Sequence, residues 1–373
     1  MKIVLLSVCS LSLALIVIIV TVDPLQVLHK SWLRPGMYYT DFRIGALGVI
    51  KYANFDSVII GSSMLENTSA NEASRKLGEN FINISFCGST PFEKSRVLQK
   101  LFREKKYIKT VILSVDICYI LKKDSHVTKF KDYGFLYDDD NPVTNMAIYF
   151  GCYRNLNFFY ILKSRFTSDF DMPTNWYKGE FFKACGGFKN WISFYNRTKD
   201  KDFLRIFVDI KKVYRGEKSH ATDLGAAEKK AIVERLNEDV ISLARSNPKT
   251  IFHVIMPPYS RLTWKLDMGL FFRELKCAMK YLVEFSKKYE NLRIHGFDNE
   301  TFTADITNYG DPGHYCPKIN EFMLDAIKNG KHILTPENID DYLEQMEEGI
   351  KKFDLKPFYD LVKCLPLGGV AED

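Results

Sequence analysis

The sequence lacks the patterns that mark metal, cofactor and nucleic-acid sites. Its eight cysteines form no C-x-x-C pair and have no histidine partner at zinc-ligand spacing, so we expect no metal site. The chain has no glycine-rich phosphate-binding loop, and we expect no cofactor. A formal net charge of +6, from 52 basic and 46 acidic residues, is not gathered into a dense basic stripe, which argues against nucleic-acid binding.

Apolar and aromatic side chains, by contrast, are abundant. Hydrophobic residues make up 46% of the 373 residues, and 28 are Phe and 20 are Tyr. This composition excludes a disordered or low-complexity polymer and indicates an aromatic-rich globular body. The length fits either one large α/β domain with an insertion or two modest domains.

The clearest local signal is a run of twenty uncharged, mostly apolar residues at 3–22. A run of this length spans the hydrocarbon core of a membrane. Lys2 precedes the run and Asp23 closes it, which favours a cytoplasmic N-terminus and an extracytoplasmic body. A cleaved signal peptide is the alternative, but no small-x-small cleavage site follows the run. We therefore expect a single-pass membrane protein.

After this run, five short apolar stretches alternate with helical patterns. Such stretches are typical of parallel strands that are covered on both faces. The alternation predicts an α/β fold with a doubly wound parallel five-stranded sheet, in which ligands bind beyond the carboxyl ends of the strands. The expected strands are 57–60, 81–85, 110–115, 251–256 and 292–297, and the main expected helices are 93–105, 226–246 and 271–289.

The remaining segments complete the expected domain organisation. Residues 1–22 form the anchor, 23–50 a juxtamembrane linker, and 51–353 the α/β domain, followed by a loose tail at 354–373. An insertion at about 120–218 is crowded with aromatic side chains, which more often form a local core than a sugar-binding platform. These include Tyr133, Phe135, Tyr137, Phe158, Phe159, Tyr160, Trp176, Tyr177, Trp191 and Tyr195.

A serine follows the first expected strand, in the sequence Gly61, Ser62, Ser63. A hydroxyl at this place lies where backbone N–H groups converge, as a nucleophile of acyl transfer requires. The tripeptide alone is more typical of an ordinary turn. Ser63 is therefore a candidate nucleophile only in combination with other residues.

An acid and a histidine follow the last expected strand as Asp311 and His314. A carboxylate three residues before a histidine can accept from Nδ1 and leave Nε2 free to take a serine proton. The alternative is a polar loop in which Asp311 caps the next helix. If the strands pair in parallel, however, Ser63, Asp311 and His314 meet at the same edge of the sheet.

Together these motifs resemble the SGNH, or GDSL-type, hydrolase superfamily. There the nucleophile follows the first strand, a glycine follows the second, an asparagine follows the third, and D-x-x-H comes near the end. Ser63 matches the nucleophile, Gly88 the second-block glycine, and Asp311 and His314 the last block. The resemblance implies a flavodoxin-like SGNH fold with a Ser-His-Asp triad, and an oxyanion hole formed by the N–H groups of Ser63 and Gly88.

Two positions depart from the SGNH pattern. Ser62 replaces the usual aspartate before the nucleophile, and Asp116 stands where the family has its asparagine. An ionised Asp116 cannot donate a hydrogen bond to an oxyanion. We treat Ser62, Asp116 and Tyr259, which follows the fourth expected strand, as candidate site-lining residues, although Tyr259 after two prolines also fits a rigid turn.

The Gly-Ser-Ser variant, the anchor and the segment 311–315 are similar to the single-pass companions of membrane-bound O-acyltransferases. This resemblance implies an extracytoplasmic serine O-acyltransferase or esterase that acts on a cell-surface glycan or acylated polymer. It also implies a multi-span membrane O-acyltransferase as a partner. The alternative, which Ser62 and Asp116 motivate, is a non-catalytic SGNH-like subunit that binds glycan or docks on a membrane acyltransferase.

Overall fold

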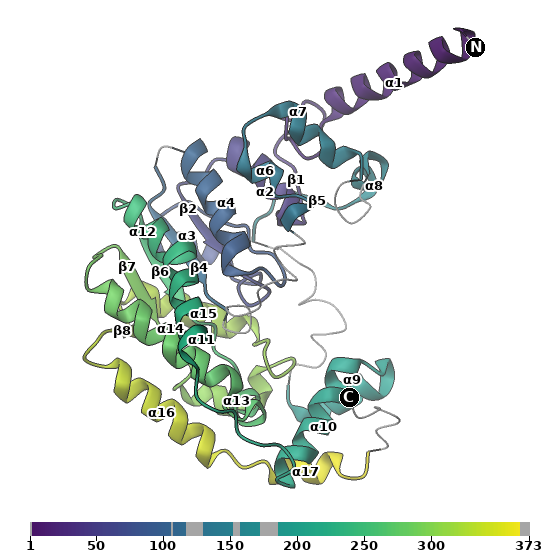
Figure 1. Cartoon of the computed structure of the whole chain (residues 1–373). Helices are drawn as coiled ribbons and strands as arrows, with labels where there is room; N and C mark the ends of the chain where they lie inside the picture. The colour runs from purple at the N-terminus through teal and green to yellow at the C-terminus, as the bar shows by residue number, and fades with distance from the viewer. Residues whose placement is uncertain (1, 106, 117–129, 152–156, 172–185, 366–373) are drawn as a thin grey trace.

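A mixed sheet of six strands forms the centre of the body (Figure 1). The computed structural model describes residues 2–105, 107–116, 130–151, 157–171 and 186–365. The strand order is β3-β2-β4-β6-β7-β8, in which all neighbours pair in parallel except β7 and β8. The strands are β2 (Ser57–Ile60), β3 (Phe81–Asn83), β4 (Thr110–Ser114), β6 (Ile251–Ile255), β7 (Leu292–His295) and β8 (Ile333–Leu334).

The chain is therefore an α/β protein, but its sheet is not the five-stranded parallel sheet that the sequence predicts. Each of the five expected runs contains a strand. The sixth strand, β8, has only two residues and lies between α15 (Pro317–Lys328) and α16 (Ile339–Lys352). A strand this short leaves no periodic signal in the sequence.

Both faces of the sheet are buried, because alternate strand residues point to opposite sides. Val58 and Ile60 belong to one core cluster, whereas Ile59 belongs to the other. Helices that contribute to the first cluster are α2 (Phe42–Tyr52), α4 (Pro91–Glu104), α11 (Ala226–Leu236), α14 (Leu270–Ser286) and α16. Helices that contribute to the second are α3 (Ala70–Leu77), α9 (Phe188–Thr198), α10 (Lys201–Tyr214), α15 and α17 (Lys356–Val362). The expected helix 226–246 comprises α11, a π-helical turn at Asn237–Ile241 and α12 (Ser242–Ser246).

The expected linker at 23–50 is an integral part of the folded body. It contains β1 (Tyr38–Tyr39), which pairs antiparallel with β5 (Phe166–Thr167), and most of α2, which is buried from Phe42 to Ile50. Two glycines allow α2 to approach the backbone of this segment closely. A Cβ at Gly45 would lie 2.3 Å from the carbonyl oxygen of Tyr39, and one at Gly48 would lie 2.5 Å from that of Leu25.

The described parts of the insertion lie at two ends of the body (Figure 1). Near α1 lie α6 (Phe135–Asp138), α7 (Pro142–Asn145), a 3-10 turn at Met146–Tyr149 and α8 (Phe158–Lys163). Helices α9 and α10 lie at the other end, where α10 contacts α17. Tyr133, Tyr137, Tyr149 and Trp191 are fully buried, as expected for a local core; Trp176 and Tyr177 lie outside the described residues. Helix α17 occupies part of the expected loose tail, and residues 366–373 lie outside the described residues.

Helix α1 (Lys2–Val22) projects from the body (Figure 1). Its mean hydropathy is 3.1 and most of its side chains are exposed. The helix is long and apolar enough to cross a membrane, a property that N-terminal signal sequences share.

Candidate active site

The turn after β2 places Ser63 beyond the carboxyl end of the sheet. The chain turns at Gly61, where a Cβ would lie 2.7 Å from Cβ of Leu65, so a side chain would not fit. The carbonyl of Ser62 accepts hydrogen bonds from the N–H groups of Leu65 and Glu66, which closes the turn. As a result Ser63 is half-buried and its hydroxyl is fixed at the edge of the sheet.

The structure brings Ser63, His314 and Asp311 together in one hydrogen-bonded chain. Oγ of Ser63 lies 2.9 Å from Nε2 of His314, and Nδ1 of His314 lies 2.7 Å from Oδ2 of Asp311. The other carboxylate oxygen, Oδ1, accepts the N–H groups of Gly313 at 2.8 Å and His314 at 2.7 Å. This geometry allows a proton to pass from the hydroxyl to Nε2 while Asp311 holds the imidazole in place.

The alternative reading of Asp311 as a helix cap does not hold. The next helix, α15, has Cys316 as its N-cap residue, five positions after Asp311. The N–H groups that Asp311 accepts belong to its own loop. Its carboxylate therefore orders the loop and the imidazole, not the helix.

The electrostatic surroundings favour an ionised Asp311 beside a basic His314. Burial alone would lower the pKa of His314, but the charge and hydrogen bond of Asp311, with Glu66 and Asp116 also nearby, raise it above its ordinary value of 6.5. Burial alone would raise the pKa of Asp311, but the imidazole and the two backbone N–H groups lower it below its ordinary value. A carboxylate and a neighbouring base with an elevated pKa suit general base catalysis.

The loop that carries Asp311 and His314 is held by the start of α13 (Arg261–Asp267). The carbonyl of Pro312 accepts from Oγ of Ser260 at 2.7 Å and from Oγ1 of Thr263 at 2.5 Å. The ring of Tyr259 lies against the same loop, since a Cβ at Gly313 would lie 3.4 Å from Cε1 of Tyr259. Tyr259 is thus placed beside the histidine loop.

The expected oxyanion donors lie in two turns near this chain. Gly88 has a φ of 64°, a left-handed conformation that favours glycine. Within the described part of the chain, neither the N–H of Ser63 nor that of Gly88 has a hydrogen-bond partner. Both are therefore available to a ligand oxygen.

Ser62 and Asp116 contact each other beneath the site instead of lining it. Oγ of Ser62 donates to Oδ1 of Asp116 at 2.5 Å, while Lys94 Nζ and Ser114 Oγ each donate to Oδ2 at 2.7 Å. Asp116 is 1% exposed, and Lys94 is fully buried. The two residues that depart from the SGNH pattern are therefore partners in one buried network, which corrects their expected role as lining residues.

Sequence reasoning missed Lys94 and Arg43. Lys94 sits on an amphipathic helix, where a lysine normally belongs to the solvent face. Arg43, from the expected linker, donates to the carbonyl of Cys87 and lies 3.7 Å from Glu93, so it braces the turn that ends in Gly88. No local pattern identifies these residues, because each contact joins segments distant in the sequence.

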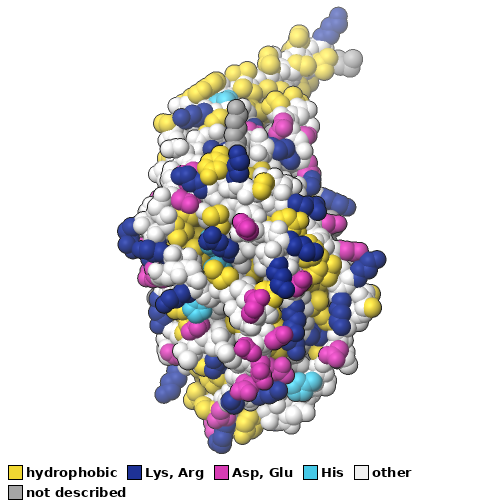
Figure 2. All heavy atoms as spheres, turned by 90° about the vertical axis from the view of Figure 1, so that its left-hand side faces the viewer, with side chains coloured by type: hydrophobic (Ala, Val, Ile, Leu, Met, Phe, Trp, Pro, Cys, Tyr) yellow, Lys and Arg dark blue, Asp and Glu magenta, His cyan; other side chains and the backbone are white. Residues whose placement is uncertain are grey.

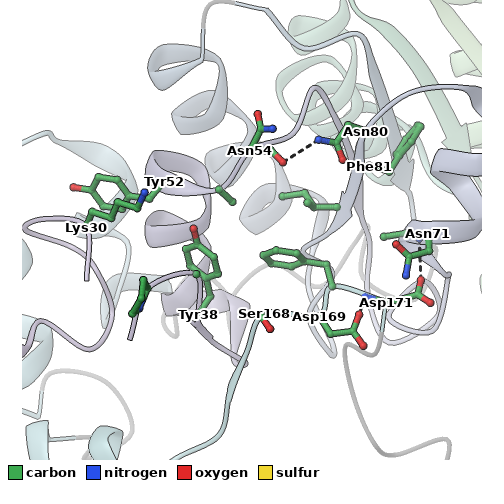
Figure 3. Close-up of a pocket in the computed structure, with 16 residues that line it drawn as sticks. Lys30, Tyr38, Tyr52, Asn54, Asn71, Asn80, Phe81, Ser168, Asp169 and Asp171 are labelled. Carbon is green, nitrogen blue, oxygen red and sulfur yellow. Dashed lines mark hydrogen bonds between the residues drawn. The ribbon is translucent and has the colours of Figure 1, made fainter. Parts of the chain in front are cut away.

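A cavity of about 400 Å³ lies elsewhere, between the segment at 30–38 and the start of α3 (Figure 3). Its labelled lining side chains include Tyr38, Asn71 and Asn80, and it contains none of Ser63, Asp311 or His314.

Among the residues that the structure describes, no group of three or more His, Cys, Asp or Glu side chains could hold a metal ion.

Comparisons with protein-family models, curated proteins and solved structures find no match to this chain.

Proposed function

We propose that this protein is a serine acyltransferase or esterase of the SGNH type, with the flavodoxin-like fold of that superfamily. The observation that carries the proposal is the hydrogen-bonded chain from Ser63 through His314 to Asp311. The five parallel strands, which bring segments 61–63 and 114–116 to one edge, support the fold assignment. The position of Ser63 after β2 and of the D-x-x-H loop after β7 follows the SGNH order.

The reaction proceeds in two steps. Nε2 of His314 takes the proton of Ser63 as Oγ attacks an ester carbonyl, and the N–H groups of Ser63 and Gly88 stabilise the oxyanion. The leaving alcohol takes that proton as the carbon–oxygen bond breaks, which leaves an acyl-serine. A sugar hydroxyl or water then gives its proton to His314 as it attacks the acyl group, and the bond between the acyl carbon and Oγ of Ser63 breaks as Oγ takes that proton back from His314. Asp311 remains ionised and stabilises the imidazolium in both steps.

The substrate proposed is an acylated cell-surface glycan or polymer, with α1 as the membrane anchor and the body on the extracytoplasmic side. A multi-span membrane O-acyltransferase is the proposed partner. The apolar helix α1 and the motif resemblance support this assignment.

Labelling with a fluorophosphonate probe tests the serine mechanism. The full chain in detergent should be labelled, and Ser63→Ala should lose both labelling and model-ester turnover. Adding His314→Ala to Ser63→Ala should cost little further activity, because the losses caused by substituting members of one catalytic relay are not additive. Full ester turnover in Ser63→Ala would eliminate the proposal.

The second candidate is a non-catalytic SGNH-like subunit. It is favoured by Asp116, whose two carboxylate oxygens are engaged and whose ionised side chain has no hydrogen to donate to an oxyanion. If the protein is such a subunit, the purified and folded chain should not react with the fluorophosphonate probe but should still bind the glycan or the acyltransferase.

A further inference from the structure

Helix α1 is fixed to the body by a buried carboxylate at its end. Asp23 is fully buried, and it accepts the N–H groups of Val27 at 3.2 Å, Leu28 at 2.9 Å and His29 at 2.8 Å. The hydroxyl of Tyr149, from the insertion, also donates to this carboxylate. The helix therefore leaves the body in a defined direction and not through a flexible tether.

The last turns of α1 pack against the body. Ile19 is 1% exposed, and Leu15 and Val22 also contact the same hydrophobic core. From Leu15 to Val22 the helix rises about 10 Å. Crossing the hydrocarbon core takes about 20 residues, and α1 has 21. Full insertion of α1 consequently brings the adjoining surface of the body to the membrane boundary.

That surface carries an exposed tryptophan. Nε2 of His29 lies 2.6 Å from the carbonyl of Val20 in α1, and the His29 ring stacks on Trp32 with centroids 4.0 Å apart. Trp32 is 65% exposed, and its neighbour Leu33 is also exposed. A large indole is thus held beside the last turn of the helix.

The insertion carries three more exposed aromatic residues at this end of the body. The ring of Tyr149, which is bonded to Asp23, contacts Phe158, and Phe158 contacts Phe159 with centroids 5.6 Å apart. Phe150, Phe159 and Tyr160 are each more than half exposed. Figure 1 shows α7 and α8, which frame this segment, beside the foot of α1.

Basic side chains accompany these apolar groups. Lys30, Lys163 and Arg165 are exposed, and the Arg34 guanidinium lies 3.9 Å from the centroid of the Phe166 ring. Figure 2 shows hydrophobic and basic side chains together at the end of the body from which α1 projects. Aromatic rings with Lys and Arg are the residues that proteins place at membrane–water interfaces.

We propose that five apolar and aromatic residues form a collar that is immersed in the head-group region of the bilayer: Trp32, Leu33, Phe150, Phe159 and Tyr160. The basic side chains beside them contact the lipid phosphates; these are Lys30, Arg34, Lys163 and Arg165. The proposal rests on α1 crossing the membrane. A lipid surface, not a protein, is the favoured occupant because the collar adjoins an apolar helix long enough to cross a membrane and combines aromatic with basic groups.

Tryptophan quenching in bilayer nanodiscs tests the collar on the full chain. Lipids brominated near the head group should quench the emission of Trp32, and Trp32→Phe should abolish that quenching. All samples carry Trp176→Phe, because Trp176 lies outside the described residues, and Trp191 and Trp264, which are buried in the body, provide the unquenched background. In the Trp32→Phe chain, Phe159→Trp should restore quenching, whereas Leu361→Trp, at an exposed site on α17, should not.

Resistance to carbonate extraction, measured on the same samples, reports insertion of α1 independently of any catalytic assay. An inserted chain whose Trp32 is not quenched would overturn the collar and favour a protein occupant. Equal quenching of tryptophan at positions 159 and 361 would also overturn it. Extraction of the wild-type chain by carbonate would contradict the anchor and, with it, the collar, while leaving the serine mechanism untouched.

Discussion

At the level of single residues, the pairing of His314 with Asp311 governs how the proposed activity depends on pH. His314 must be neutral to take the Ser63 proton. Because Asp311 raises the pKa of His314, activity should fall as the pH drops through a value above 6.5.

Asp311→Asn should move this acid limb to lower pH. Without the carboxylate, burial is the dominant influence, and burial lowers the pKa of His314. The plateau of kcat/KM should also fall, on the order of 100-fold to 10,000-fold, because the imidazolium loses its counter-charge. The pH profile of ester turnover measures both effects, and an acid limb that stays in place would show that Asp311 does not tune His314.

The buried pair of Lys94 and Asp116 makes a second residue-level prediction. Lys94→Met leaves a buried carboxylate without its counter-ion and should cost about 3–5 kcal/mol of unfolding free energy. Asp116→Asn should be similarly costly because it leaves the lysine unpaired. The double variant should lose less than the sum of the two, since neither charge remains.

Denaturant unfolding in detergent measures these differences. Lys280→Met is a matched control, because Lys280 pairs with Asp340 at 2.6 Å on the surface, where the loss should be below about 1 kcal/mol. Additive losses in the double variant would contradict a coupled pair.

At the level of elements, the contact between α13 and the histidine loop predicts a positioning role for Thr263. Thr263→Val keeps the shape of the side chain but removes the hydrogen bond to Pro312. Because small displacements of catalytic groups are costly, kcat should fall about tenfold or more with little change in KM. The acid limb of the pH profile should broaden or shift as His314 moves, which a purely structural role would not produce.

Thr198→Val provides the control for that experiment. Thr198 also donates its hydroxyl to a backbone carbonyl, but it does so within α9, outside the hydrogen-bonded chain of Ser63. Its kinetics should match the wild type. Equal effects of the two substitutions would remove Thr263 from the site.

The elements themselves differ in how far the sequence could predict them. The parallel strands were predictable because buried β-branched runs are distinctive. Helix α2 was not, because it is buried along most of its length and contains Gly45 and Gly48, so it has neither an amphipathic period nor a strong helix propensity. The buried roles of Ser62 and Asp116 required the register of β2 and β4, which aligns Ile60 with Leu113.

The residues of the candidate site also differ in whether the sequence could predict them. Ser63, Asp311 and His314 were predictable because each belongs to a short motif at a strand end. Lys94 and Arg43 act through contacts with segments far away in the chain, and no local pattern encodes such contacts.

At the level of the whole molecule, the Asp23 joint is predicted to couple α1 to the body. Asp23→Ala would leave three backbone N–H groups, one buried and two part-buried, and the buried Tyr149 hydroxyl without their acceptor, and should cost about 3 kcal/mol. Hydrogen exchange at residues 27–29 should accelerate, and thermal unfolding should begin earlier.

Two variants calibrate this result. Asp23→Asn keeps one acceptor oxygen and should be milder. Asp200→Ala removes the N-cap of α10 at the far end of the body and should cost about 1 kcal/mol without affecting exchange at 27–29. Unchanged exchange in Asp23→Ala would mean that the joint is not rigid.

A rigid joint also limits where the site can work. A domain on a flexible stalk sweeps a volume and can reach substrates at many heights above a bilayer. With α1 in a membrane and Asp23 fixing its exit, Ser63 would instead travel at a single height, and its search for substrate would be a lateral search in two dimensions. Selection among acceptors would then depend on how far each group stands from the membrane as well as on its chemistry.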